Sequence, residues 1–232
     1  MAPPARRLVE YPFMRDIALP ASQPESETET PRLNRRQAAK VRTRQKVLDA
    51  ARRLFAERGY EPATIRDIAK GAGMSTGAVF ANFQDKAELF EAVLSEDMLK
   101  LAETLKAAAA AETTLRARLL AALTAGYHSS LEQLPLVQAV IARSWFQPVA
   151  AEMRTRTSIK PLVMVVSDAL QTGVREGELR QDADVRLLGE LIYDAYLSNY
   201  RRAAYDGWSI QQLTTQIGKQ IDIILAGQLS RQ

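Results

Sequence analysis

From about residue 36 onward, hydrophobic positions recur three and four residues apart, which is the period of an amphipathic helix. Glycine and proline are sparse after residue 34, so we expect an all-α fold. A proline at position 161 predicts a kink or a break in the seventh helix. The predicted helices span about 36–58, 64–73, 75–83, 86–109, 113–133, 136–146, 150–175, 185–207 and 210–224.

The first 34 residues follow no apolar period and contain clustered prolines and a polar run, Ser22–Pro31. We expect residues 1–34 to be a mostly disordered arm. The basic run at 32–46 either begins the first helix or forms an arm that reaches into a neighbouring DNA groove.

Residues 64–86 predict two short helices joined by a glycine turn, which is the pattern of a helix-turn-helix. Thr64 and Asp67 have the spacing of a capping box at the start of the first of these helices. Gly73 suits the left-handed conformation that the turn requires, and Ser75 suits the N-cap of the second helix.

Positive charge gathers around this motif. Residues 35–86 contain twelve lysines and arginines against five acidic residues, whereas the whole chain has a net charge of only +4. Neutralisation of phosphates dominates non-specific DNA affinity, so this segment is the expected DNA surface. A solvated charged face accounts for the same charge.

The sequence lacks several of the common motifs of metal-binding and catalytic proteins. The chain has no cysteine and one histidine, which excludes the common zinc patterns and a Cys–His dyad. It has no glycine-rich phosphate loop and no nucleophile elbow. We expect a cytoplasmic protein that is no enzyme and binds no cofactor or metal. The alternatives are a helical scaffold or small-molecule-binding protein, or a carboxylate-dependent enzyme, with a vestigial DNA-binding motif.

One stretch carries a more specific signal, the run VLDAARRLFAERGYEPATIRDIAKGAGMSTGAVFANFQDKAELFEAVL at 47–94. It resembles the N-terminal region of the TetR family of transcriptional regulators. The resemblance implies a three-helix DNA-binding domain at 35–86 and a helical bundle at 87–232 for effector binding and dimerisation. The implied function is that of a regulator, commonly a repressor, that binds a palindromic operator as a homodimer.

The resemblance also implies which residues meet DNA. The helix after Ser75 would lie in the major groove, while Thr64 and Lys86 would bind phosphates. Phe80 departs from the family, which usually has a tyrosine there. The predicted DNA-binding residues are Arg42, Arg44, Thr64, Arg66, Ser75, Thr76, Gly77, Ala78, Phe80, Asn82 and Lys86.

Dimerisation through the last two helices and an effector pocket between the fourth and eighth helices follow from the same resemblance. The effector is expected to be small and hydrophobic or aromatic, with one or two polar groups. Residues of these types are more often plain core residues than ligand contacts, and for His128 and Asp168 a surface position is the ordinary alternative. The candidate lining residues are Met98, Tyr127, His128, Leu131, Trp145, Phe146, Met164, Asp168, Tyr193 and Tyr196.

Overall fold

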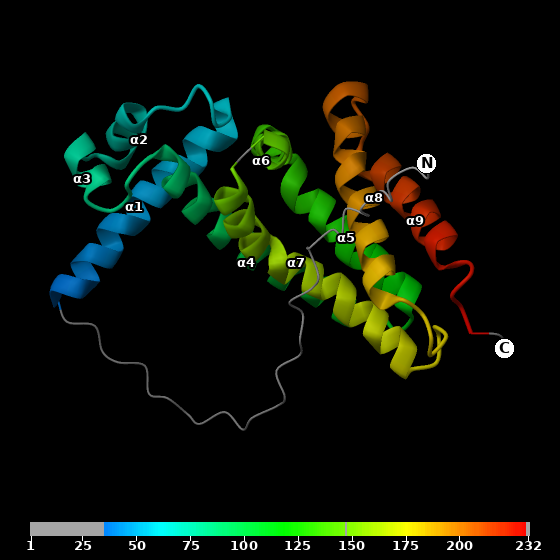
Figure 1. Ribbon diagram of the computed structural model, residues 1–232. Coiled ribbons are helices and arrows are strands. Elements are labelled where there is room, and N and C mark those ends of the chain that lie inside the picture. The colour runs from blue at the N-terminus through cyan, green and yellow to red at the C-terminus, as the bar shows by residue number, and fades with distance from the viewer. Residues whose placement is uncertain (1–34, 147, 231–232) are drawn as a thin grey trace, which may run out of the picture.

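The computed structural model describes residues 35–146 and 148–230. The secondary-structure elements in these ranges are all α-helices (Figure 1). The all-α fold is therefore confirmed; the predicted arm at 1–34 lies outside the described residues. The helices are α1 (Arg35–Arg58), α2 (Ile65–Ala72), α3 (Thr76–Phe80), α4 (Lys86–Ala110), α5 (Leu115–Leu131), α6 (Leu134–Phe146), α7 (Val149–Arg175), α8 (Val185–Asp206) and α9 (Ile210–Leu225).

Local capping fixes the limits of the short helices. The Thr64 hydroxyl accepts the backbone N–H of Asp67 at 3.1 Å, which begins α2. Gly73 ends α2 with φ of 67°, and the side chain of Ser75 accepts the N–H of Ala78 to begin α3. Asp85 caps α4 in the same way through Glu88. These contacts are local, and they confirm the predicted starts of α2, α3 and α4 and the end of α2 at Gly73. The predicted end of α3 near residue 83 is wrong, because the helix ends at Phe80.

The N-terminal helices share an aromatic core with the start of α4. Phe55, Tyr60 and Phe90 pack together with ring centroids 4.8–5.8 Å apart. Ile68 of α2 and Val79 of α3 are fully buried in the same cluster. α1, α2 and α3 therefore form a single unit whose core extends into α4.

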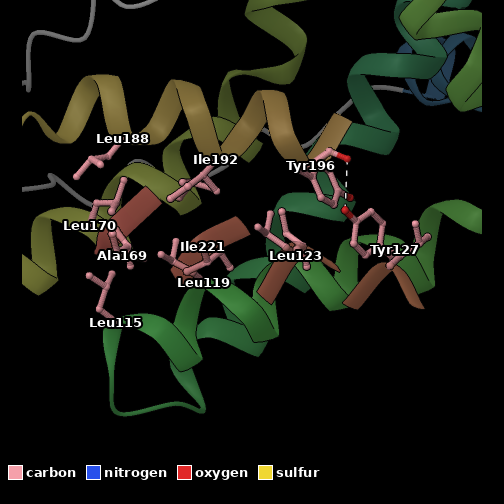
Figure 2. Packing of buried hydrophobic residues seen from close by; sticks show 14 of the residues in the cluster. Leu115, Leu119, Leu123, Tyr127, Ala169, Leu170, Leu188, Ile192, Tyr196 and Ile221 are labelled. Carbon is pink, nitrogen blue, oxygen red and sulfur yellow. Dashed lines mark hydrogen bonds between the residues drawn. The ribbon is translucent and has the colours of Figure 1, made fainter. Parts of the chain in front are cut away.

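The second core lies among α5, α7, α8 and α9 (Figure 2). Leucines of α5 recur every four residues and face Ile192 of α8 and Ile221 of α9. Gly126 allows a close approach here, because a Cβ added to it would lie 2.3 Å from the Tyr196 hydroxyl.

α7 continues through Pro161 as one helix, so the break allowed by the sequence does not occur. Proline removes one backbone hydrogen bond, but the following turns bury Leu162, Val166 and Leu170 against other helices. That packing holds the helix together across the proline.

The whole molecule is elongated, with α1–α3 at one end and α8 and α9 at the other (Figure 1). α4 begins in the N-terminal unit and packs along α5 and α7, so it connects the two ends. Among the described helices, none is both long and apolar enough to cross a membrane.

Candidate DNA interface and effector cavity

The helix-turn-helix exposes a compact group of side chains at α3. Ser75, Thr76 and Gly77 are exposed, and Phe80 leaves 54% of its surface in solvent. Val79, by contrast, is fully buried and fixes the orientation of the helix. The first turn of α3 and the ring of Phe80 thus lie on the surface of the basic N-terminal unit.

Two polar contacts fasten the end of α3. Asn82, just beyond α3, donates through Nδ2 to the carbonyl of Ala78 at 2.9 Å. Its side-chain amide thus supplies a donor to a carbonyl in the last turn of α3. Arg44 of α1 donates to the carbonyl of Asn82 at 3.2 Å and lies over the ring of Phe83, 4.2 Å from its centroid. Arg44 therefore holds α3 against α1.

Lys86 has a structural role in this unit. Its ammonium group donates to the carbonyls of Tyr60 and Glu61 at 2.9 and 3.1 Å and lies 4.2 Å from the centroid of the Tyr60 ring. An ammonium group has three N–H donors, so one is left for a further acceptor. Thr64, Arg66 and Arg42 are exposed on the same unit.

A cavity of about 270 Å³ lies between α4, α6 and α8, and the end of α5 and the middle of α7 complete its wall. Aliphatic side chains make up most of the wall, which suits an apolar molecule. Polar groups reach it from Asp97 and Lys100 of α4, from Ser129, Ser130 and Gln133, and from three tyrosines of α8, namely Tyr193, Tyr196 and Tyr200.

The tyrosines form a hydrogen-bonded group at this cavity. The hydroxyls of Tyr196 and Tyr200 lie 2.6 Å apart, and Asn199 donates to the hydroxyl of Tyr127 at 3.1 Å. Burial raises the pKa of Tyr127, Tyr196 and Tyr200, so these hydroxyls are neutral around pH 7. They can therefore donate to or accept from a ligand, but they do not supply charge.

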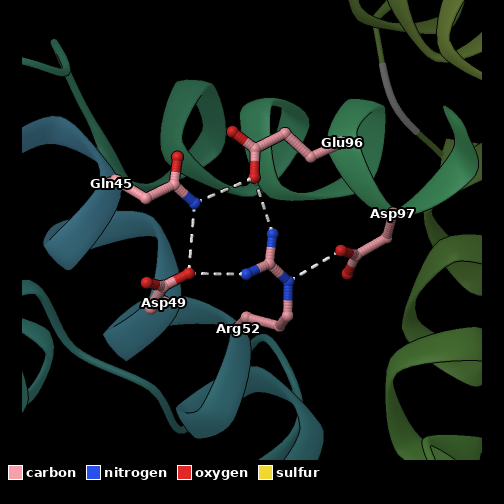
Figure 3. A network of polar contacts seen from close by, with 5 residues as sticks. All are labelled: Gln45, Asp49, Arg52, Glu96 and Asp97. Carbon is pink, nitrogen blue, oxygen red and sulfur yellow. Dashed lines mark hydrogen bonds and ion pairs between the residues drawn. The ribbon is translucent and has the colours of Figure 1, made fainter. Parts of the chain in front are cut away.

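A network centred on Arg52 connects α1 to α4 beside the cavity (Figure 3). Arg52 donates to Asp97 at 2.7 Å, to Glu96 at 2.8 Å and to Asp49 at 2.9 Å, and Gln45 bridges Asp49 and Glu96. Asp97 also lines the cavity. A single carboxylate therefore touches both the cavity and the link to the N-terminal unit.

The helix-turn-helix segment matches the family model of bacterial regulatory proteins of the tetR family over residues 47–93. The transcriptional repressor KstR2 of Rhodococcus jostii is 31% identical over 156 residues, which cover 65% of this chain and 74% of that protein. The chain belongs to the TetR family.

Two further proteins match over different lengths. The transcriptional repressor AcnR of Corynebacterium efficiens is 50% identical over 64 residues, 28% of this chain and 34% of that protein, so this match spans about a third of the relative. FadR of Bacillus subtilis, solved in complex with stearoyl-CoA, superposes with a TM-score of 0.69 at 18% identity and covers 79% of this chain and 98% of that one. The superposition shows the shared fold.

The structure separates the candidate effector residues of this TetR-family chain. Met98, Tyr193 and Tyr196 line the cavity. Tyr127 packs against Tyr196 in the core, with ring centroids 4.7 Å apart, and Leu131 is half-buried beside it. These five positions all lie at or near the cavity between α4 and α8.

The other candidates lie elsewhere. Met164 and Asp168 line a separate, more open cavity of about 490 Å³ between α4, α5 and α7, because they lie on a different face of α7. His128 is exposed and Phe146 leaves 90% of its surface in solvent, and neither belongs to the lining of these two cavities. The side chain of Trp145 lies outside the described part of the chain.

The sequence predicts only Trp145 and Phe146, at the end of α6, as lining residues from this helix, whereas the structure places its middle turns at the cavity. Leu136, Val137, Val140 and Ile141 of this helix line the cavity, and Leu136 is also buried in the core of the DNA-binding unit. The guanidinium of Arg143 lies 4.3 Å from the centroid of the Tyr60 ring. The sequence shows that α6 has an apolar face. It does not show that this helix packs between the cavity and the aromatic core of the N-terminal unit, because that placement depends on tertiary contacts.

Proposed function

We propose that the chain is a cytoplasmic transcriptional repressor that binds a palindromic DNA operator as a homodimer and is released by a small apolar effector. The observation that carries the proposal is the exposed first turn of α3 on a unit with a net positive charge. The KstR2 and AcnR relatives are named as repressors, which supports the direction of regulation.

In this proposal, α3 enters the major groove and the surrounding residues hold the DNA backbone. Ser75, Thr76, Gly77 and Ala78 approach base edges or phosphates, and Phe80 and Asn82 meet the adjoining bases. Phosphate contacts come from residues around α3, namely Arg42, Arg44, Thr64, Arg66 and Lys86. Arg44 and Lys86 would offer only the donors that their contacts within the protein leave over.

The proposed dimer forms through α8 and α9. Leu187 and Leu191 of α8 and Ile223 of α9 are exposed apolar side chains, although the opposite faces of both helices are packed within the chain. Two copies paired through this surface would present their two recognition helices, the α3 of each copy, about one DNA turn apart, roughly 34–36 Å.

The proposed effector site is the cavity between α4, α6 and α8. Its volume of about 270 Å³ and aliphatic wall suit a slender apolar molecule with one or two polar groups. A structure of KstR2 from Mycobacterium tuberculosis, 25% identical, belongs to a ketosteroid transcriptional regulator, which supports an apolar effector here. The effector would favour a state in which α4 is displaced, and it shifts the population only by its difference in affinity for the two states.

The test is a titration of the full-length protein against labelled DNA from its own promoter region, with a base-shuffled duplex as competitor. We expect preference for the promoter DNA and a steep fall in affinity with salt. Thr76→Ala should relax the preference, while Arg66→Ala should weaken binding to both duplexes and lower the salt slope by about one. Lys106→Ala, in the bundle, is the matched control. Equal binding of both duplexes at moderate salt would refute the proposal.

A further inference from the structure

The two carboxylate oxygens of Asp97 have different surroundings. Oδ1 accepts a hydrogen bond from Arg52 at 2.7 Å. Oδ2 is buried and has no hydrogen-bond partner among the described residues. A buried carboxylate oxygen requires a donor, which must then come from water or from a bound molecule. Since Asp97 lines the cavity, a molecule bound there can supply that donor.

The charges around Asp97 also favour a donor. Arg52 is the one cation that contacts Asp49, Glu96 and Asp97 within the described network, so three carboxylates share one positive charge. Burial raises the pKa of Asp97, and Arg52 offsets only part of this effect. Lys100 is exposed at the edge of the cavity and lowers the pKa from a greater distance.

We propose that Asp97 recognises an ammonium or hydroxyl group on an otherwise apolar effector, and that this contact loosens the hold of Arg52 on α4. The inference rests on the proposed function, because it assigns the polar anchor of the proposed effector site. It deepens that proposal by naming the chemistry of the ligand: a hydrogen-bond donor, with a carboxylate group disfavoured at this position.

The coupling follows from the shared carboxylate. A donor at Oδ2, above all a cationic one, withdraws negative charge from Asp97 and weakens its pairing with Arg52. Arg52 belongs to α1, so a weaker pair loosens the DNA-binding unit from α4. By reciprocity, DNA that favours the tight Arg52–Asp97 pair must weaken binding of the effector by the same factor.

The experiment compares three probes with the same apolar chain: octylamine, 1-octanol and octanoate. Calorimetric titration of the full-length protein should give the tightest binding for octylamine, weaker binding for 1-octanol and the weakest for octanoate. In Asp97→Asn, we expect the affinity for octylamine to fall about tenfold or more, because a hydrogen bond to a charged group is lost. Asp49→Asn is the matched control: it alters the same network outside the cavity lining and should keep the octylamine preference.

The second readout is promoter DNA. Octylamine should weaken DNA binding by the wild-type protein and by Asp49→Asn, but not by Asp97→Asn. Octanoate binding as tightly as octylamine would overturn the inference while leaving an apolar effector site in place. An octylamine preference that survives in Asp97→Asn, or binding of none of the probes, would also overturn it. A failure of the promoter titration itself would refute the proposed function instead.

Discussion

The ammonium group of Lys86 lies where the start of α4 meets the connection between α1 and α2. It belongs to the first turn of α4, it binds two carbonyls in the connection between α1 and α2, and it lies over the ring of Tyr60. The resemblance to the TetR family suggests a phosphate contact for this residue. Its position supports a second role, which is to hold the start of α4 against the N-terminal core.

We expect Lys86→Ala to lower the free energy of unfolding by about 1–3 kcal/mol, because two hydrogen bonds from a charged donor and a cation–π contact are lost. Urea denaturation followed by circular dichroism measures this change. Lys70→Ala is the control, since Lys70 is an exposed lysine of α2 and should change stability by less than about 0.5 kcal/mol. Equal stability of the two variants would show that Lys86 contributes only to DNA binding.

Single residues show what the sequence can and cannot predict. The caps at Thr64 and Ser75 and the left-handed Gly73 depend on neighbours within three or four positions, so the sequence predicts them correctly. The partners of Arg44 and Lys86 lie 38 and about 25 residues away along the chain. Such contacts depend on how the helices pack, which no local pattern specifies.

At the scale of elements, helix limits follow from hydrophobic period and capping, but helix neighbours do not. The sequence predicts α4 and α8 as walls of the cavity only through the family resemblance. It does not predict that α6 lies between the cavity and Tyr60, nor that Arg52 joins α1 to α4. Both features come from packing between helices that are distant in the chain.

The pair formed by Arg52 and Asp97 is the shortest of the polar contacts in the network that joins α1 to α4. Their side chains are 18% and 17% exposed, so the pair is largely shielded from solvent. A double-mutant cycle with Arg52→Gln and Asp97→Asn should give a coupling energy of about 1–3 kcal/mol in urea denaturation. The control cycle uses the exposed pair Arg180–Asp182, where we expect less than about 1 kcal/mol. Equal coupling in both cycles would refute a special role for this link.

The Arg52→Gln variant should also show a characteristic pH dependence. Burial raises the pKa of Asp97, and Arg52 opposes this shift, so its removal raises the pKa further. A carboxyl group with a raised pKa binds more protons in the folded state, and its contribution to stability falls as pH rises through that pKa. The stability deficit of Arg52→Gln is therefore full at neutral pH and smaller at about pH 4.5. A deficit that grows on acidification would contradict the assignment.

At the scale of the whole molecule, the DNA-binding unit and the α8–α9 surface lie at opposite ends, and α4 connects them (Figure 1). A dimer paired through the proposed α8–α9 surface would thus fix the distance between its two copies of α3 at the other end. Leu187 and Leu191 lie four residues apart and so share one face of α8, beside the face that buries Leu188 and Ile192. This exposed apolar face is the surface that a partner copy would cover.

Leu191→Glu should therefore convert the dimer to a monomer, because it places an unpaired carboxylate in the centre of the proposed interface. Sedimentation velocity should show dimer affinity reduced at least about tenfold, and affinity for a palindromic operator should fall with it, while each half-site still binds weakly. Leu99→Glu is the matched control, because Leu99 is a similarly exposed leucine, 55% against 45%, on α4. If Leu99→Glu dissociates the protein and Leu191→Glu does not, the copies pair through the surface of α4 that contains Leu99. The contact between the two α4 helices then sets the spacing of the recognition helices.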